Sequence, residues 1–360
     1  IICLMLFMTI SVLSSSLSIK SSLDSQLDKF TPVDVNLYKT AYLPESYVSS
    51  YSGKTIYNTE EQIEDSKHPV SYTLETNGYE MNSLKDIVEI PIYAVPEWTL
   101  KYSLGNYFET AKSQNSNLTY DLPETIIKVS DYNKIATLYG EEQYSLNDDE
   151  FMVICDFEQM SNMRNEALKQ NPNIEINGKT YHSKYNECQY GFIYMSVSEM
   201  NGGIIIVPDS FEFKDENIEQ YFLAANYNAE TEEEKVKLNN VLVEEDDSEL
   251  FNNLSDKGID LEGSTKISLI ESSKGLSTII IFISIYLGII FLIASSAILA
   301  LKQLTESSDN KQRYTILRKI GCDEKMINQA LFRQIFIFFM MPLALAIIHS
   351  IFGIKFILSM

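Results

Sequence analysis

Residues 276–301 read LSTIIIFISIYLGIIFLIASSAILAL, and none of these 26 positions carries a charged side chain. Sixteen of them are Ile, Leu or Phe. A helix of about 20 apolar residues crosses the roughly 30 Å hydrocarbon core of a bilayer. The stretch therefore predicts a transmembrane helix, and it separates a long polar segment before it from a short segment after it.

Two further uncharged runs predict membrane helices. Residues 334–354 lie between Arg333 and Lys355, and we expect Pro342 to kink this helix. Residues 1–19 are also uncharged and become serine-rich in their second half. A secretory signal begins with basic residues and ends in a small-residue cleavage site. Because this run lacks a basic start, we favour a transmembrane helix over a signal peptide.

The basic residues predict the orientation of the chain. The loop 302–333 has seven basic and four acidic residues, and short loops rich in Lys and Arg stay in the cytoplasm. The segment 20–275 is then extracellular, and it holds 46 of the 50 acidic and 20 of the 28 basic residues. After a third crossing only residues 355–360 remain outside, and the chain begins without Met. We therefore expect a fragment of a larger multi-pass protein of the plasma membrane.

Composition limits the function classes. A formal charge of −22 argues against a nucleic-acid-binding protein, because phosphate contacts need clustered Lys and Arg. The 22 Tyr and 18 Phe can fill a core, which argues against disorder. The extracellular segment has an α+β pattern. Its expected strands are 87–95, 125–129, 150–155, 190–197 and 203–207, and its expected helices are 161–170 and one that begins at a capping box of Thr231 and Glu234.

Motifs of catalysis and metal binding are missing from the sequence. The three histidines are scattered and show no metal-ligand spacing. Residues 258–265 (GIDLEGST) have the spacing of a Walker A motif, but Ser264 replaces the lysine that reaches the phosphates, so we interpret them as a turn. We predict no catalytic residue, no metal site and no cofactor in this chain.

The four cysteines fall in different predicted compartments. Cys3 lies in a predicted membrane helix and Cys322 in the cytoplasmic loop. Cys155 and Cys188 both lie in the extracellular segment, where a disulfide can persist. The sequence does not determine their separation, so a bridge and two free thiols both stay open.

The cytoplasmic loop predicts a helical hairpin. Residues 313–321 (RYTILRKIG) have the pattern of a short amphipathic helix that ends at Gly321, and a second helix is expected to begin at Asp323. A basic amphipathic helix can lie on the anionic membrane surface. It can equally dock a cytoplasmic subunit, and we favour docking.

The segment 313–356 resembles the carboxy-terminal part of FtsX-like ABC transporter permeases, in particular the bacitracin and antimicrobial-peptide export subgroup. The shared features are an LRKxG element at 317–321, a proline at Pro342, and the pair His349 and Ser350. The order of helix, outside domain, helix, basic loop and helix is also similar. Residues 130–146 and 202–210 also resemble sequences of this subgroup, but their patterns are less specific.

The resemblance implies a type VII ABC permease architecture, with an α+β extracellular domain inserted between transmembrane helices. Of ten helices, this chain would hold the seventh to ninth, at 1–19, 276–301 and 334–354. ATP and magnesium would bind a separate cytoplasmic ABC ATPase, expected as a dimer. Hydrolysis would move the 20–275 domain to remove, export or sense peptide antibiotics that act on the cell wall, free or bound to lipid. A sensor histidine kinase would be a further partner. The coupling residues would be Tyr314, Leu317, Arg318, Lys319, Ile320 and Gly321.

Other functions remain open at this point. A permease of the same superfamily could serve lipoprotein release, macrolide export or the control of cell-wall hydrolases. A membrane-anchored receptor or adhesin would explain the extracellular domain and the apolar runs, but not the amphipathic hairpin. No motif identifies the residues that touch a substrate.

Overall fold

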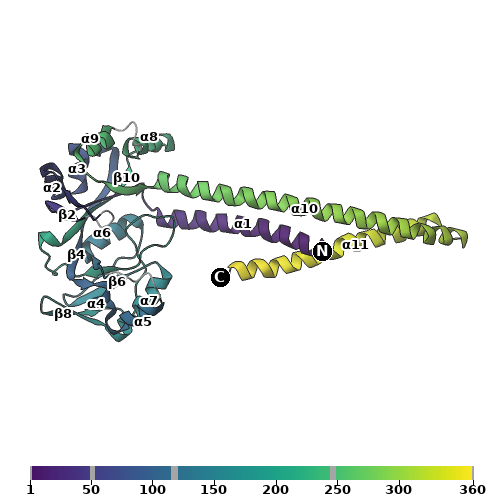
Figure 1. Ribbon diagram of the computed structural model, residues 1–360, viewed down its shortest axis with the longest axis horizontal. Helices are drawn as coiled ribbons and strands as arrows, with labels where there is room; N and C mark the ends of the chain where they lie inside the picture. The colour runs from purple at the N-terminus through teal and green to yellow at the C-terminus, as the bar shows by residue number, and fades with distance from the viewer. Residues whose placement is uncertain (1, 49–52, 115–120, 244–248, 359–360) are drawn as a thin grey trace. The chain divides into compact units, whose positions relative to one another are not determined.

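The computed structural model describes residues 2–48, 53–114, 121–243 and 249–358. The chain forms two compact units: a globular unit of residues 26–271, and a helical unit of residues 1–25 and 272–360. The elements, many of which are labelled in Figure 1, are α1 (Ile2–Phe30), β1 (Val35–Thr40), β2 (Ser46–Val48), β3 (Thr55–Tyr57), α2 (Glu60–Ser66), α3 (Val70–Thr76), η1 (Met81–Ser83), β4 (Leu84–Thr99), α4 (Leu100–Leu104), η2 (Gly105–Tyr107), α5 (Phe108–Gln114), β5 (Pro123–Lys128), α6 (Val129–Tyr139), β6 (Glu150–Ile154), α7 (Glu158–Gln170), β7 (Asn173–Ile176), β8 (Lys179–Ser183), β9 (Ile204–Val207), η3 (Asp215–Asn217), β10 (Ile218–Tyr227), α8 (Glu232–Val243), α9 (Glu249–Lys257), β11 (Glu262–Thr265), α10 (Lys266–Lys319) and α11 (Glu324–Leu358).

A mixed sheet of nine strands forms the centre of the globular unit, in the order β11-β1-β10-β4-β5-β9-β6-β8-β7. The pairs β5–β9 and β6–β8 are parallel, and the other neighbouring pairs are antiparallel. Strands β2 and β3 form a separate small hairpin. The predicted α+β character of this segment is confirmed, whereas its extracellular location stays a prediction.

Both faces of the sheet are buried at its central strands. Successive side chains of a strand point to opposite faces. In β9, Ile204 and Ile206 join one apolar cluster, while Ile205 and Val207 join another. Strand β10 divides its side chains in the same way, because Phe222 joins one cluster while Leu223 packs with residues of α3, α8 and α9 in another. Figure 1 shows these three helices close together beside β10. A strand buried on both faces explains why the sequence of β9 is uniformly apolar rather than alternating.

Most expected elements are present, and one is not. Strands β4, β5, β6 and β9 and helices α7 and α8 occur at the predicted places. The capping box is formed, since Glu234 N donates to Thr231 Oγ1 over 3.2 Å and Thr231 N donates to Glu234 Oε2 over 3.3 Å. The strand predicted over 190–197 is wrong, because this segment is irregular. Its apolar side chains fill the core, but Met195 N donates to the side-chain oxygen of Asn36 in β1 and not to a backbone carbonyl oxygen of a strand.

The two ends of the globular unit lie side by side. Strand β1 follows α1 and pairs with β11, which precedes α10, so that Val35 lies opposite Thr265. Lys266 N also donates to the carbonyl oxygen of Asp34 over 2.9 Å. Gly263 permits this close pairing, because a β-carbon there would collide with the carbonyl oxygen of Asn36.

The helical unit contains two helices that are long and apolar enough to cross a membrane among the residues the structure describes: Lys266–Lys319 and Glu324–Gly353. They contain the predicted spans 276–301 and 334–354. Helix α1 contains residues 2–19 of the third predicted run, and the crossing of the membrane by this run stays a prediction. Within this unit, Leu13 of α1 lies against Gly288 of α10, and Phe7 lies against Gly353 of α11. Small residues let membrane helices approach closely.

One helix boundary differs from the prediction. The short amphipathic helix expected over 313–321 is the last part of α10, which continues without a break from Lys266 to Lys319. The cause is visible in the sequence, because residues 302–319 contain neither Gly nor Pro. The predicted cytoplasmic loop is therefore the tip of a long helical hairpin.

Candidate functional site

The tip of the α10–α11 hairpin is a tight turn of residues 320–323. Gly321 has a φ of +89°, a left-handed conformation that glycine adopts at low cost. Cys322 N donates to the carbonyl oxygen of Leu317 over 3.1 Å, and Gly321 N donates to that of Arg318 over 3.2 Å. These bonds close the end of α10, as expected for a helix that ends before a glycine. Gly321 thus has a structural role in the turn.

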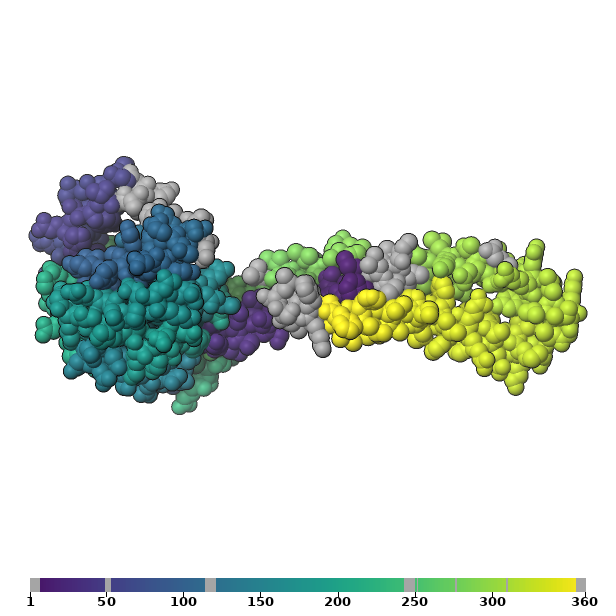
Figure 2. Space-filling view, turned by 90° about the horizontal axis from the view of Figure 1, so that it is seen from below, coloured from purple at the N-terminus to yellow at the C-terminus, as the bar shows by residue number. Residues whose placement is uncertain are grey.

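Two side-chain contacts hold the helices of the hairpin together. Arg318 Nε lies 2.6 Å from Glu324 Oε1 across the turn. Further from the tip, the Tyr314 hydroxyl donates to Gln334 Oε1 over 3.2 Å. Figures 1 and 2 both show α10 and α11 running side by side toward the tip. Tyr314 and Arg318, which the sequence suggested for ATPase contact, therefore contact the second helix of the hairpin, although Arg318 stays exposed.

The remaining predicted coupling residues differ in exposure. Leu317 is half-buried, while Lys319 and Gly321 are exposed. Ile320 is 71% exposed, and Ile316, one turn earlier on the same face, is 58% exposed. The sequence analysis missed Ile316, although its spacing of four residues from Ile320 was a visible signal. The structure thus presents an apolar pair at the hairpin tip.

Cys155 and Cys188 lie on neighbouring chain segments in the globular unit. Cys155 N donates to the carbonyl oxygen of Gln189 over 2.9 Å, and Gln189 N donates to that of Val153 over 2.8 Å. Both cysteines are free thiols in this structure. A hydrogen bond from the Cys188 thiol lowers the pKa of Cys155, and the nearby Arg164 guanidinium acts in the same direction. The two cysteines thus lie on neighbouring segments joined by backbone hydrogen bonds, and Cys155 Sγ lies 3.0 Å from the carbonyl oxygen of Asn201.

We expect these two cysteines to form a disulfide in protein purified from cells without reductant. The two thiols would lose two protons, and a small-molecule disulfide or oxygen would take up the two electrons. Alkylation followed by mass spectrometry should then modify Cys322 and leave Cys155 and Cys188 linked. Reduction should free both and lower the unfolding free energy by about 2–4 kcal/mol. Full alkylation of all three residues in unreduced protein would contradict the prediction.

A buried ion pair lies close to these cysteines. Arg164 of α7 contacts Glu124 of β5 through two nitrogen–oxygen pairs of 2.9 and 2.8 Å, and Arg164 Nε donates to the carbonyl oxygen of Gly202 over 2.7 Å. Gly203 leaves space for the guanidinium, because a β-carbon there would collide with it. Arg164 therefore has no free charge for a ligand.

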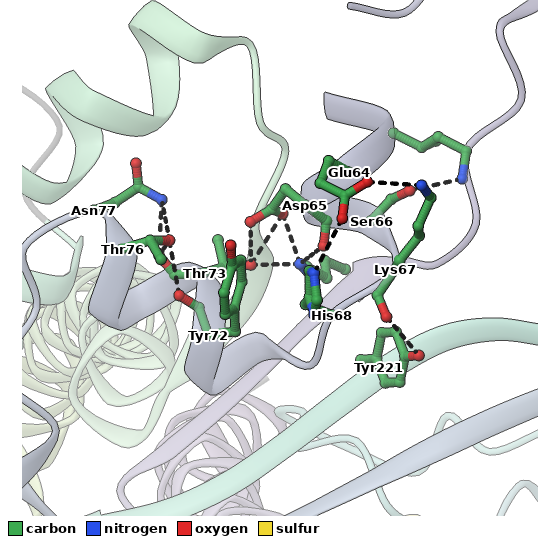
Figure 3. Close-up of polar contacts among 12 residues, drawn as sticks. Glu64, Asp65, Ser66, Lys67, His68, Tyr72, Thr73, Thr76, Asn77 and Tyr221 are labelled. Carbon is green, nitrogen blue, oxygen red and sulfur yellow. Dashed lines mark hydrogen bonds and ion pairs between the residues drawn. The ribbon is translucent and has the colours of Figure 1, made fainter. Parts of the chain in front are cut away.

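A second buried cation, Lys39 of β1, is also fully paired. Its Nζ donates to the carbonyl oxygen of Asp65 over 2.7 Å, to Asp65 Oδ2 over 2.6 Å, and to the Thr73 hydroxyl. An ammonium group has three N–H donors, so these contacts use all of them. Burial lowers the pKa of Lys39, and Asp65 opposes this effect. Figure 3 shows Asp65 facing Thr73 within this group. Although Lys39 lines a hollow of about 480 Å³, its role is structural.

Metal binding has no visible basis in the described ranges, which hold no group of three or more His, Cys, Asp or Glu side chains arranged around a common point.

The chain is similar to known permeases. It is 29% identical over 193 residues to the bacitracin export permease protein BceB of Bacillus subtilis, an alignment that covers 51% of this chain and 27% of the relative. It is 26% identical over 108 residues to the ABC transporter permease protein YxdM of the same organism, covering 30% and 17%. It is 37% identical over 91 residues to BceB of Halalkalibacterium halodurans, covering 25% and 14%. No protein-family model matches the chain.

These similarities support a permease role for this chain. The relatives are ABC transporter permeases, and this class agrees with a large mixed-sheet unit and two apolar helices. The matched part of the chain spans about a quarter or less of the length of the relatives.

Proposed function

We propose that this chain is part of the permease subunit of an ABC transporter that removes, exports or senses peptide antibiotics acting on the cell wall. A separate cytoplasmic ATPase would hydrolyse ATP, and the globular unit would lie outside the cell. The observation that carries the proposal is the similarity to a bacitracin export permease over 51% of the chain. The acidic segment 20–275 agrees with it, because negative charge steers cationic peptides.

The hairpin tip is the part of the chain that we assign to the ATPase. Ile316 and Ile320 present apolar side chains at the end of a helix pair, and Lys319 adds a positive charge beside them. Most of the binding energy of a protein interface comes from a few residues that lose all contact with water. Tyr314 and Arg318 would position the tip through their contacts with Gln334 and Glu324 rather than touch the ATPase.

Replacement of Ile320 by aspartate tests this assignment. The full-length permease would be purified with a candidate ABC ATPase from the same organism, and the recovered ATPase would be quantified. Because the new charge would lose its hydration in the interface, we expect recovery to fall about tenfold or more, which corresponds to about 1.4 kcal/mol. Hydrolysis stimulated by a bacitracin-like peptide should fall in parallel.

Leu122→Asp is the matched control, because it makes the same change at an aliphatic side chain of similar exposure, 66%, in the globular unit. It should leave ATPase recovery unchanged. If Ile320→Asp binds the ATPase as well as wild type does, the hairpin tip is not the contact. If wild type itself recovers no ATPase, the permease proposal gives way to an anchored receptor.

A further inference from the structure

The globular unit contains a cavity of about 520 Å³ that the proposed function does not explain. Its walls come from β1, α7, the start of β9 and the irregular segment that replaces the predicted strand over 190–197. Cavities of this size commonly enclose most of the surface of a ligand with a few tens of atoms.

One wall of the cavity is apolar and adaptable. It includes Met160, Met195, Met200, Phe192 and Tyr194. Methionine side chains are unbranched and polarizable, so they can fit apolar groups of different shapes. This wall favours a ligand with a hydrocarbon or aromatic body.

The polar groups of the cavity are almost all used by the protein itself. Arg164 is paired with Glu124. The Asn201 amide group donates to the carbonyl oxygen of Gly191 over 2.7 Å, and its side-chain oxygen accepts from Gly203 N over 2.9 Å. These groups therefore offer a ligand little further hydrogen bonding.

Asp156 differs from these groups. Its carboxylate accepts hydrogen bonds from the backbone N–H groups of Asn201, over 2.7 Å, and of Met200, but within the described part of the chain it forms no ion pair. Burial raises the pKa of Asp156 to about 6, and Glu199 adds to this effect while Lys29 opposes it. A cation that binds beside a half-buried carboxylate can supply the ion-pair partner that the carboxylate lacks.

We propose that this cavity binds a small amphipathic amine, with the ammonium group at Asp156 and the apolar body against Met160, Met195 and Phe192. The geometry supports one positive charge, because Asp156 is the only carboxylate among the lining residues. The ligand could be a free amine or the basic side chain of a peptide. The proposal rests on the cavity alone and does not depend on the transport role.

The test measures binding of 4-phenylbutylamine to the full chain in detergent by titration calorimetry. The neutral 4-phenylbutanol serves as a control for partition into apolar space. We expect Asp156→Asn to weaken amine binding about tenfold or more and to change alcohol binding by less than about twofold. Asp215→Asn, at an exposed position in η3, is the matched control and should leave both affinities unchanged.

Two further measurements locate the ligand. The labelled methyl groups of Met160, Met195 and Met200 should shift on addition of the amine, and each signal can be assigned by a Met→Leu variant. Affinity for the amine should rise between about pH 5 and pH 7, as Asp156 ionises through a pKa of about 6. Lys29 and Glu199 are the charged groups that face Asp156, and the raised pKa of Tyr190 keeps its phenol neutral in this range. Cys155 also faces Asp156, and a hydrogen bond from Cys188 lowers the pKa of its thiol.

A competition experiment with a peptide distinguishes a free amine from a basic peptide side chain as the ligand. If the dipeptide amide Phe-Lys displaces the amine, the cavity accepts a basic side chain, and if it does not, the cavity takes a free amine. Equal binding of amine and alcohol, with no effect of Asp156→Asn, would overturn the proposal. If Asp156→Asn fails to fold, Met200→Trp tests the proposal instead. Met200 is 68% exposed, so a larger side chain at this position can fill the cavity without disturbing the core. Unchanged amine affinity in that variant would also overturn the proposal.

Discussion

Arg164→Met is expected to lower the free energy of unfolding of the globular unit by about 3–5 kcal/mol, because it leaves the Glu124 carboxylate buried without its partner. The side chains of Arg164 and Glu124 are only 6% and 4% exposed, so water cannot replace the lost contacts. The carbonyl oxygen of Gly202 would lose its donor as well. Denaturant unfolding followed by the fluorescence of the single tryptophan, Trp98, measures the change, since Trp98 is fully buried in the same unit.

The double variant Glu124→Met with Arg164→Met is the control for this prediction. It removes both charges, and replacing a buried ion pair by apolar side chains of similar volume is often neutral or stabilising. We therefore expect it to recover most of the stability that the single change loses. If Arg164→Met alone costs less than about 1 kcal/mol, the pair is hydrated in solution and the buried geometry is wrong.

Lys39→Met is expected to cost about 3 kcal/mol in the same assay, because Asp65 would then be a buried carboxylate without a cation. The Thr73 hydroxyl lies 2.8 Å from Asp65 Oδ1 and would still satisfy part of its hydrogen bonding. For this reason we place the effect at the lower end of the range for broken buried pairs. The loss would loosen the attachment of α2 and α3 to β1.

Lys67→Met is the matched control for Lys39→Met. Lys67 pairs with Glu64 over 2.7 Å at the surface, with 46% and 61% of the two side chains exposed, and Figure 3 shows this pair beside Asp65. Exposed pairs contribute little, so we expect a change within about 0.5 kcal/mol. Equal effects of the two substitutions would show that burial does not distinguish the two lysines.

The sequence was sufficient for features that depend on neighbouring residues. The capping box of Thr231 and Glu234 formed as predicted, because its two partners are three residues apart. The hairpin turn at Gly321 was also predicted, whereas the start of its first helix was not. A helix without Gly or Pro continues until a breaker stops it, so the amphipathic pattern over 313–321 marked a face of α10 and not a separate helix.

The segment 190–197 shows where local pattern fails. Its apolar and aromatic residues are typical of a strand. In the fold, Phe192, Ile193 and Met195 are buried as a strand would require, but Met195 N donates to the Asn36 side chain and Ser196 N to the carbonyl oxygen of Phe30 rather than to a paired strand. Burial and strand pairing are therefore separate properties, and only burial is visible in composition.

The sequence by itself determined the apolar helices 276–301 and 334–354, the mixed helix and strand character of the segment between the first two apolar runs, and the glycine turn at the hairpin tip. These features depend on residues that are close in the chain, where hydropathy, capping and backbone preference act. The tertiary structure alone decided the pairing of Arg164 with Glu124, the burial of Lys39 against Asp65, and the cavity at Asp156. Their partners are distant in sequence, and they meet only in the folded unit, where Asp65 of α2 reaches Lys39 of β1 and Arg164 of α7 reaches Glu124 of β5.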